Sequence, residues 1–251
     1  MRKLIDINCD VGESSGRYQV GNDEALIPHI SSCSIACGWH AGDAATIERT
    51  VRLAVKHSVR IGAHPSYPDR EGFGRRYMQL SAADLSAGIK YQVGVIKALA
   101  ESNGGKLAYV KPHGALYNRI AIDEVEARTA YEAIREFDDS LSVMGLAGSS
   151  CEDVAAQIGI DFISEAFADR TYDDEGLLVS RTNTNALITD PSKAAHQVLD
   201  VCSGKLQSVK GNQLTIAADS ICIHGDNPQA EAIVLAIRNF LEREQISIGY
   251  A

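Results

Sequence analysis

Short apolar runs alternate along the chain with longer stretches whose apolar residues recur with the helical period. The runs are rich in β-branched residues and mostly continuous, as expected of strands that are covered on both faces. Repeated strand–helix units of this kind are typical of a parallel sheet. We predict seven strands, at Leu4–Cys9, Ser34–Ala36, Val59–Ala63, Leu107–Lys111, Leu141–Gly145, Phe162–Ala166 and Ser220–His224.

The stretches between the runs carry the marks of amphipathic helices. The clearest apolar stripe extends from Leu85 to Leu99 and is typical of a helix that packs one face on a sheet. A capping residue followed by an acid or by proline indicates where a helix begins. Candidate helix starts of this type are Ser81 with Asp84, Asp190 with Pro191, and Asn227 with Pro228.

The strand–helix units follow one another without a linker, an internal repeat or a low-complexity segment. This continuity predicts one α/β domain over residues 1–251, a barrel of seven or eight parallel strands. An open, doubly wound sheet is the alternative. Asp169–Leu187 and Val209–Ala218 do not fit the alternation, and we predict loops or short extra strands there.

Composition excludes some partners. The formal net charge is −9 and the basic residues are scattered, which disfavours nucleic acid because phosphates need clustered Lys and Arg. The six cysteines form no C-x-x-C pair, and most lie in apolar runs, where a reduced thiol packs as a small hydrophobe. No signal peptide or membrane-length apolar run is visible, so we expect a cytoplasmic protein with no membrane contact.

The histidines indicate where chemistry takes place. Four of the seven, His40, His64, His113 and His224, come just after a predicted strand and close before glycine or proline. In a parallel barrel the carboxyl ends of all strands open on one face, so these imidazoles should converge. Further polar residues at strand ends are Asp6, Asn8, Asp10, Glu13, Lys111, Glu165, Asp169, Arg170 and Asp226. The sequence therefore predicts an active site at this rim.

Structural roles are the alternative for each residue taken singly. A lone histidine at a strand end is more often a hydrogen-bonded structural residue, but four in equivalent positions are hard to assign to packing. Asp6 and Asn8 share a side of the first strand with Asp10 and are equally compatible with a role inside the barrel. A structural ion pair between Glu165 and Arg170 is as compatible with the sequence as catalysis by Glu165.

These residues lie in eight segments, from Asp6–Glu13 to Ser220–Asp226, which together resemble the LamB/YcsF family. Small departures are Trp39, where phenylalanine is common, and Ser66, where glycine is usual. The matching segments run in order through nearly the whole chain: Asp6–Glu13, Gly21–Glu24, Ile35–Asp43, Ile61–Asp69, Gly72–Arg76, Val110–Asn118, Glu165–Arg170 and Ser220–Asp226.

The resemblance implies a barrel similar to the polysaccharide deacetylase fold and a hydrolase acting on a cyclic amide. Members of the family are the A subunits of prokaryotic 5-oxoprolinases, which with B and C subunits convert 5-oxo-L-proline, ATP and water to L-glutamate, ADP and phosphate. The chain has no G-x-x-x-x-G-K-[ST] loop. This fits a division of labour in which the complete complex requires ATP, the B and C subunits activate the lactam, and the A subunit opens it.

Roles can be assigned to the rim residues on this basis. Catalytic candidates are Asp10 and His113, which would activate water, with Lys111 and Glu165. Candidates for substrate binding are Arg170, His224, Asp226 and Asn8. A divalent metal is a further hypothesis, with Asp10, His40 and His64 as its ligands. The alternative functions are a metal-dependent carbohydrate deacetylase, which would act alone and without ATP, and a scaffold for the other subunits.

Overall fold

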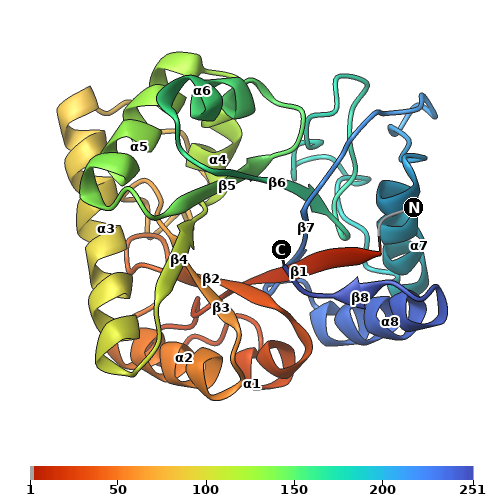
Figure 1. The fold of residues 1–251 in the computed structure, drawn as a ribbon, viewed down its shortest axis with the longest axis horizontal. Helices are drawn as coiled ribbons and strands as arrows, with labels where there is room; N and C mark the ends of the chain where they lie inside the picture. Colours follow the sequence, from red (N-terminus) through yellow and green to blue (C-terminus); the bar gives the residue numbers. More distant parts are fainter. Residues whose placement is uncertain (1–2, 251) are drawn as a thin grey trace.

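The structure is a computed structural model that describes residues 3–250. Its sheet closes on itself, because the first strand pairs in parallel with both the second and the seventh. The result is a parallel barrel of seven strands (Figure 1). The predicted barrel is confirmed, and the closure rules out the doubly wound sheet. The strands are β1 (Leu4–Val11), β2 (Ser32–Ala36), β3 (Arg60–His64), β4 (Leu107–Val110), β5 (Ser142–Leu146), β6 (Phe162–Phe167), β7 (Ser220–His224) and β8 (Ser247–Ile248).

All seven predicted strands are present, and their ends differ from the prediction by at most two residues. The eighth strand, β8, was not predicted. It pairs only with Leu4 and Ile5 at the start of β1, outside the closed barrel. Two partly exposed residues leave no hydrophobic pattern that a sequence reading would detect.

Helices surround the barrel, as Figure 1 shows for α2, α3, α5, α7 and α8. The apolar stripe from Leu85 to Leu99 lies in α3, and its residues Leu85, Ile89, Val93 and Ile96 are buried. The helices are α1 (Asp23–Leu26), α2 (Ala44–Lys56), α3 (Ala82–Ser102), α4 (Gly114–Ile120), α5 (Glu124–Phe137), α6 (Ser150–Ile158), α7 (Pro191–Ser203) and α8 (Ala230–Arg243), with a short 3₁₀ helix η1 (Ile27–His29).

Two of the three predicted helix starts are confirmed. The Ser81 side chain accepts a hydrogen bond from the Asp84 backbone amide, and Asp190 accepts from the amides of Ser192 and Lys193. The third was wrong, because α8 begins at Ala230, after Asn227 and Pro228. Asn227 Oδ1 accepts a hydrogen bond from the Gln229 amide at 3.0 Å, and its Nδ2 donates to Asp169 Oδ2 and to the Ile188 carbonyl. The side chain therefore closes a turn ahead of the helix and fastens that turn to the loop after β6.

The interior of the barrel is polar along β1. Asp6, Asn8 and Asp10 alternate with buried apolar residues and reach partners on other strands, as the period of a strand requires. Asp6 accepts hydrogen bonds from the hydroxyls of Ser31, Ser32 and Ser220. The interior is therefore a hydrogen-bonded network. Asp10 lies at the carboxyl end of β1, where this network reaches the rim of the barrel.

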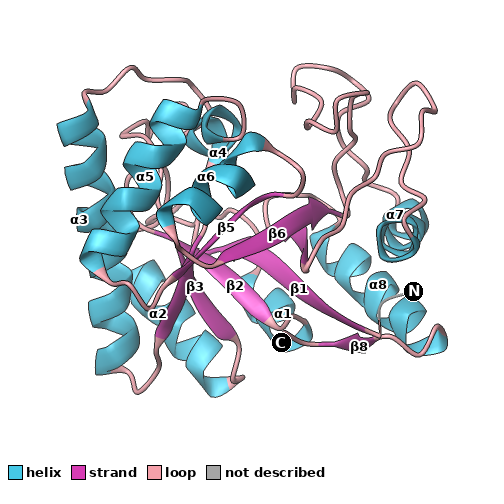
Figure 2. Cartoon of the chain, turned by 45° about the horizontal axis from the view of Figure 1, so that its top comes forward, coloured by secondary structure: helices cyan, strands magenta, loops and turns pink. Residues whose placement is uncertain are grey.

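The two segments that did not fit the alternation contain only isolated bridges, as predicted. Figure 2 shows long loops above the barrel on the side of α7. Arg170 fastens the first segment, since its guanidinium donates to the carbonyls of Val179 and Ala186. Across residues 3–250 no helix combines the length and apolarity needed to cross a membrane.

Candidate active site

A cavity of about 590 Å³ opens at the carboxyl ends of the strands. Asp10, Lys111 and three histidines, His64, His113 and His224, line it from the strand side. Leu146, Phe167, Leu177 and Leu178 give it an apolar wall, and Arg75, Arg170 and Arg181 also line it. The predicted convergence of strand-end residues is therefore present, in a cavity large enough for a small molecule.

Lys111 is the centre of a buried charge network. Its Nζ lies 2.8 Å from Asp10 Oδ1 and 2.7 Å from Glu165 Oε1. It also donates to Asn8 Oδ1 at 3.2 Å and to Cys222 Sγ at 3.1 Å. Asn8 in turn donates to Glu165 Oε1 at 2.9 Å. One ammonium therefore fixes two carboxylates that come from different strands of the barrel.

The contacts in this network determine the protonation states of Lys111 and Asp10. Burial alone would lower the pKa of Lys111, but the charge of Asp10, with those of Cys222 and Glu165, holds it well above its usual value. Burial alone would raise the pKa of Asp10, yet His64 and Lys111 hold it well below its usual value. Lys111 is therefore cationic and Asp10 anionic at neutral pH.

A second group of buried side chains lies beside the first. Glu13, His40, His64 and His113 bring one ligand atom each to within 4.8 Å of one another. Glu13 Oε1 lies 3.4 Å from His40 Nε2 and 3.7 Å from His113 Nδ1. His64 Nε2 lies 3.4 Å from Asp10 Oδ2, which connects this group to the lysine network.

The hydrogen bonds of two imidazoles determine where their protons lie. His64 Nδ1 is 2.7 Å from the Lys111 carbonyl, and His113 Nε2 is 2.8 Å from the Phe73 carbonyl. A carbonyl only accepts, so both of these nitrogens carry hydrogen. The remaining nitrogens, His64 Nε2 and His113 Nδ1, then face each other at 2.9 Å. Two neutral rings would bring two lone pairs together there, which requires a proton or a metal cation between them.

The residues of this group fit a metal cation. Both nitrogens of His40 are buried without a hydrogen-bond partner. Burial, with the charge of neighbouring histidines, holds the pKa of His40 and of His113 well below the usual value, so both rings are neutral and able to ligate. Three imidazoles and one carboxylate form a donor set that suits zinc and similar ions.

A second group of side chains, Asp10, Cys222 and His224, could also hold a metal ion by its geometry, but it differs from the first group in one respect. The ammonium of Lys111 already contacts both Asp10 and Cys222. The cation at this position is therefore the lysine itself.

Gly74 allows a loop to cover the histidines. Its φ is +66°, and a Cβ at this position would lie 2.7 Å from His113 Cδ2 and 2.8 Å from His40 Cβ. Only glycine fits so close an approach. Gly74 belongs to the segment Gly72–Arg76 of the family resemblance, and the close approach it permits is at the candidate metal group.

His224 and Asp169 form a separate pair at the end of β7. His224 Nδ1 lies 2.8 Å from Asp169 Oδ1, and the ring stacks on Phe167 with centroids 5.2 Å apart. Asp169 also accepts from the His224 amide and from Asn227. These contacts fix the orientation of the imidazole, whose edge lines the cavity.

The structural alternative that we considered for Glu165, an ion pair with Arg170, was wrong. Glu165 pairs with Lys111, and Arg170 binds backbone carbonyls, so the partner of Glu165 lies far along the chain rather than near it. Arg170 does line the cavity. Burial, and then the charge of Arg181, lower the pKa of Arg170 to about 10.

Two arginines were missed by the sequence reading. Arg75 follows Gly74, and Arg181 belongs to the irregular segment after β6. Both form ion pairs with Asp226 Oδ2, Arg181 at 3.5 Å. Nothing in the hydrophobic period of irregular segments indicates where their side chains lie, and only the dipeptide Arg75–Arg76 gave a local sign of positive charge.

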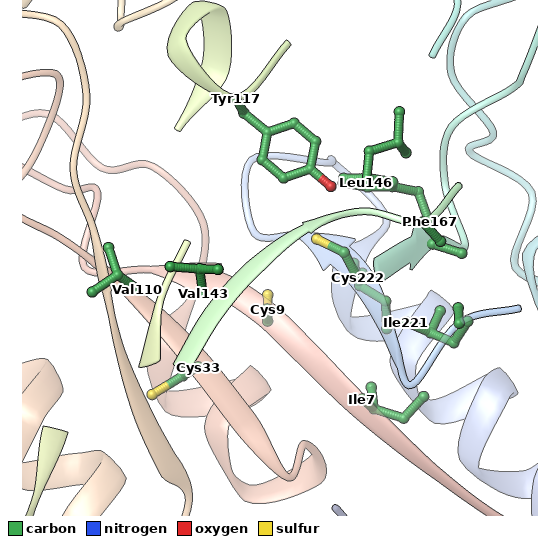
Figure 3. Packing of buried hydrophobic residues seen from close by; sticks show 14 of the residues in the cluster. Ile7, Cys9, Cys33, Val110, Tyr117, Val143, Leu146, Phe167, Ile221 and Cys222 are labelled. Carbon is green, nitrogen blue, oxygen red and sulfur yellow. The ribbon is translucent and has the colours of Figure 1, made fainter. Parts of the chain in front are cut away.

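Tyr117 is a further residue at the cavity. It is 4% exposed, lines the cavity, and its hydroxyl has no hydrogen-bond partner. Figure 3 shows this hydroxyl pointing away from its helix, toward Cys222 and Leu146. One oxygen of Glu165, Oε2, is also buried without a partner.

The predicted site residues thus fall into four positions. Asp10, Lys111, His113, His64, Arg170 and His224 line the cavity. Asn8 and Glu165 are buried behind Lys111 and are in contact with it. Asp226 holds the two arginines, and His40 belongs to the group of possible metal ligands.

Comparison with known proteins gives full-length matches. The chain is 47% identical over 245 residues to the A subunit of 5-oxoprolinase from Shouchella clausii, covering 97% of both chains. It is 45% identical over 252 residues to the A subunit of 5-oxoprolinase from Bordetella pertussis, covering 100% of both chains.

Solved structures agree with this likeness. The lactam utilization protein of Thermus thermophilus superposes with a TM-score of 0.92 at 38% identity, covering 100% of both chains. The polysaccharide deacetylase Bc1974 of Bacillus cereus superposes with a TM-score of 0.52 at 14% identity, covering 100% of this chain and 92% of that one. The second likeness shows the fold alone, and it confirms the expected deacetylase-like barrel.

The description of the matching family model is "LamB/YcsF family", and the match extends over residues 5–251. It includes every segment on which the resemblance was based. The chain belongs to the LamB/YcsF family.

Proposed function

We propose that this chain is the A subunit of an ATP-dependent 5-oxoprolinase, and that its cavity opens the cyclic amide of 5-oxo-L-proline to give L-glutamate. The B and C subunits would work with it and activate the lactam at the expense of ATP. Full-length identity of 47% and 45% to curated A subunits supports the assignment. The observation that carries it is the group of Asp10, Lys111 and three histidines that line one cavity at the carboxyl end of the barrel.

The acid and base roles follow from the charges of these groups. A lactam is a resonance-stabilised amide, so its opening requires an activated water and a proton for the leaving nitrogen. Asp10 is anionic and fixed by Lys111, and its carboxylate would accept the proton that the water loses and return it to the leaving nitrogen. His113 lines the same cavity, but its Nε2–H is held by the Phe73 carbonyl and its Nδ1 belongs to the candidate metal group, so it would serve as a ligand rather than as the base.

Lys111 and Glu165 act through Asp10. The lysine is in contact with Asp10, Glu165 and Asn8, so it is a positioning residue that keeps the Asp10 carboxylate charged and directed at the cavity. Arg170 and His224, which line the same cavity, are placed to bind the carboxylate of the substrate.

A divalent cation would be held by Glu13, His40, His64 and His113. When bound, it would supply Lewis acid stabilisation of the charge that develops on the amide oxygen. Two of the three ligands suggested by the sequence, His40 and His64, are in this set. Asp10 is adjacent to it, since its Oδ2 lies 3.4 Å from His64 Nε2.

Reconstitution tests the proposal. The purified chain, the B and C subunits and ATP are combined with 5-oxo-L-proline, and L-glutamate is measured. Glutamate should appear only in the complete mixture. Asp10→Asn should lower its rate by about 10²-fold or more, because a positioned group of this kind contributes about that much.

Asp139→Asn serves as a matched control, since this exposed aspartate lies in the loop after α5. Turnover near wild type in the Asp10→Asn complex would refute the catalytic assignment. Release of acetate from an N-acetylated sugar by the chain alone, without ATP, would favour a deacetylase instead.

A further inference from the structure

Two buried polar atoms beside the cavity have no hydrogen bond. The Tyr117 hydroxyl and Glu165 Oε2 each lack a hydrogen-bond partner within residues 3–250. Nearly all buried polar groups in folded proteins are paired, and leaving one unpaired costs stability. A phenol hydroxyl can donate and an ionised carboxylate oxygen accepts, so the two atoms are chemically complementary.

The hydroxyl lies close to the Glu165 carboxylate. Burial raises the pKa of Tyr117 well above its usual value, and the charge of Glu165 and the interaction of its carboxylate with the hydroxyl raise it further. The phenol therefore keeps its proton at neutral pH and acts as a hydrogen-bond donor. In Figure 3 the hydroxyl points toward Cys222 and Leu146, which offer a weakly bonding thiol and no polar side-chain atom. Glu165 is the stronger acceptor.

The side chain of Tyr117 also reaches the cavity. It lies in the first turn of α4, where Leu116 and Ile120 are buried with it. Its ring meets Phe167 edge-on, with the ring centroids 5.8 Å apart, and it lines the cavity. A residue that contacts the cavity and lies beside Glu165 connects a bound ligand to the charge network around Lys111.

Glu165 transmits this contact to Lys111. Its other oxygen, Oε1, lies 2.7 Å from Lys111 Nζ and accepts from Asn8 at 2.9 Å. Lys111 Nζ lies in turn 2.8 Å from Asp10 Oδ1. The last torsion of a glutamate is soft, so the carboxylate can tilt Oε2 toward the Tyr117 hydroxyl while Oε1 keeps its contacts. A donor on Oε2 would fix the plane of this carboxylate, and with it the ammonium that holds Asp10.

The hydroxyl of Tyr131 provides a contrast. It too is buried without a hydrogen-bond partner in the described part of the chain, but it lies beside the Cys151 thiol, and Tyr131 does not line the cavity. An unpaired hydroxyl alone is therefore no sign of function. At Tyr117 the unpaired hydroxyl coincides with the cavity and with a carboxylate of the charge network.

We propose that Tyr117 is a positioning residue for the opening of the lactam. Its hydroxyl donates a hydrogen bond to Glu165 Oε2 and thereby fixes the chain of contacts from Glu165 through Lys111 to Asp10. The inference rests on the proposed function and adds to it a group that acts through Glu165. Because the bond joins a neutral donor to a charged acceptor, it is stronger than one between two neutral groups.

Turnover of the reconstituted complex tests this role. With the B and C subunits in excess, so that this chain limits the rate, Tyr117→Phe should lower kcat by roughly tenfold, because a hydrogen bond to a charged group is lost. The KM for 5-oxo-L-proline should stay near the wild-type value, since the hydroxyl acts on the network and not on the substrate. Tyr131→Phe, the matched control, should keep the wild-type kcat. An unchanged kcat in Tyr117→Phe, or a rise in KM alone, would overturn the proposal.

A double-mutant cycle tests whether Tyr117 acts through Glu165. In Glu165→Gln the amide oxygen should face Lys111 and Asn8, which both donate, so that the amide NH₂ faces the hydroxyl and cannot accept from it. Tyr117→Phe should therefore lower kcat no further in this background. A second tenfold loss in the double variant would mean that Tyr117 acts independently of Glu165, contrary to the proposal.

Carbon-13 NMR of the isolated chain tests the contact without turnover. All nine tyrosines are labelled at Cζ, and the signals of Tyr117 and Tyr131 are assigned by their loss in the two phenylalanine variants. Glu165→Gln should shift the Tyr117 signal and leave that of Tyr131 in place. An unmoved Tyr117 signal would refute the hydrogen bond. Absence of glutamate with the wild-type chain would count against the proposed function, and the Tyr117 signal would still decide the contact.

Discussion

At the scale of single residues, hydrogen bonding separates buried tyrosines that look alike in sequence. Tyr172 accepts a hydrogen bond from the Phe167 amide at 2.7 Å. The hydroxyl of Tyr131 has no such partner, and its neighbour is the weakly bonding thiol of Cys151. Both rings are fully buried, so their packing contributions are comparable and the difference lies in one polar contact.

Tyr172→Phe should lower the free energy of unfolding by about 1–3 kcal/mol, because the buried Phe167 N–H loses its acceptor. Tyr131→Phe should be neutral or slightly stabilising, since it removes a buried hydroxyl that has no strong partner. Urea denaturation of both variants measures the contrast. Equal losses in the two proteins would contradict the assigned hydrogen bonding.

The buried histidines make stability depend on pH. Burial lowers the pKa of His40 and His113, whereas an unfolded histidine titrates near about 6.5. Below that pH the unfolded chain binds protons that the folded chain does not, so metal-free protein should lose stability as the pH falls from about 7 to 5. Glu13 has the opposite effect, because burial raises its pKa, but it is one group against two.

Urea midpoints of chelator-treated protein between pH 7 and pH 5 measure this slope. His40→Asn should reduce it, and His57→Asn, at an exposed position, should not. A midpoint that rises toward pH 5 in the wild type would show that the sign is wrong.

At the scale of elements, the strands were predictable because a strand covered on both faces is a continuous apolar run. The rim histidines were predictable for a related reason: once the strands are known, a parallel barrel places every strand end on one face. Glu165 illustrates the limit. Its partner, Lys111, is 54 residues away in the chain, and no local pattern pairs them. Arg75 and Arg181 were missed because they lie in irregular segments. Such segments have no hydrophobic period that would indicate where a side chain points.

The contribution of an N-terminal helix cap to stability can be measured at α7. Asp190 accepts hydrogen bonds from the amides of Ser192 and Lys193, while Gln229, at the start of α8, makes no such side-chain contact. Asp190→Ala should destabilise the protein by about 0.5–2 kcal/mol, and Gln229→Ala by less than about 0.5 kcal/mol. Thermal unfolding of both variants compares them. Equal shifts would mean that the cap contributes nothing.

At the scale of the whole molecule, the candidate metal ligands connect four neighbouring strands. Glu13 follows β1, His40 follows β2, His64 ends β3 and His113 follows β4. An ion bound to all four would act on the folded barrel only, since the unfolded chain does not hold these residues together.

Zinc or manganese added to chelator-stripped protein should therefore raise the melting temperature. At a hundred times the dissociation constant the gain is about 2.7 kcal/mol. His40→Asn should abolish the increase and His57→Asn should retain it. An unchanged wild-type melting temperature across the titration would exclude tight binding by this group.

The closure of the barrel also has a consequence for synthesis. Asp10 and His224 are register partners across β1 and β7, and a Cβ on Gly225 would lie 2.3 Å from the Asp10 carbonyl. One wall of the cavity at the carboxyl end of the barrel is thus made near the start of translation and the other near its end. While the ribosome is still adding residues, β1 has only one neighbour and Asp10 lacks its surroundings, so a nascent chain cut short before β7 would be inert however well its helices had formed.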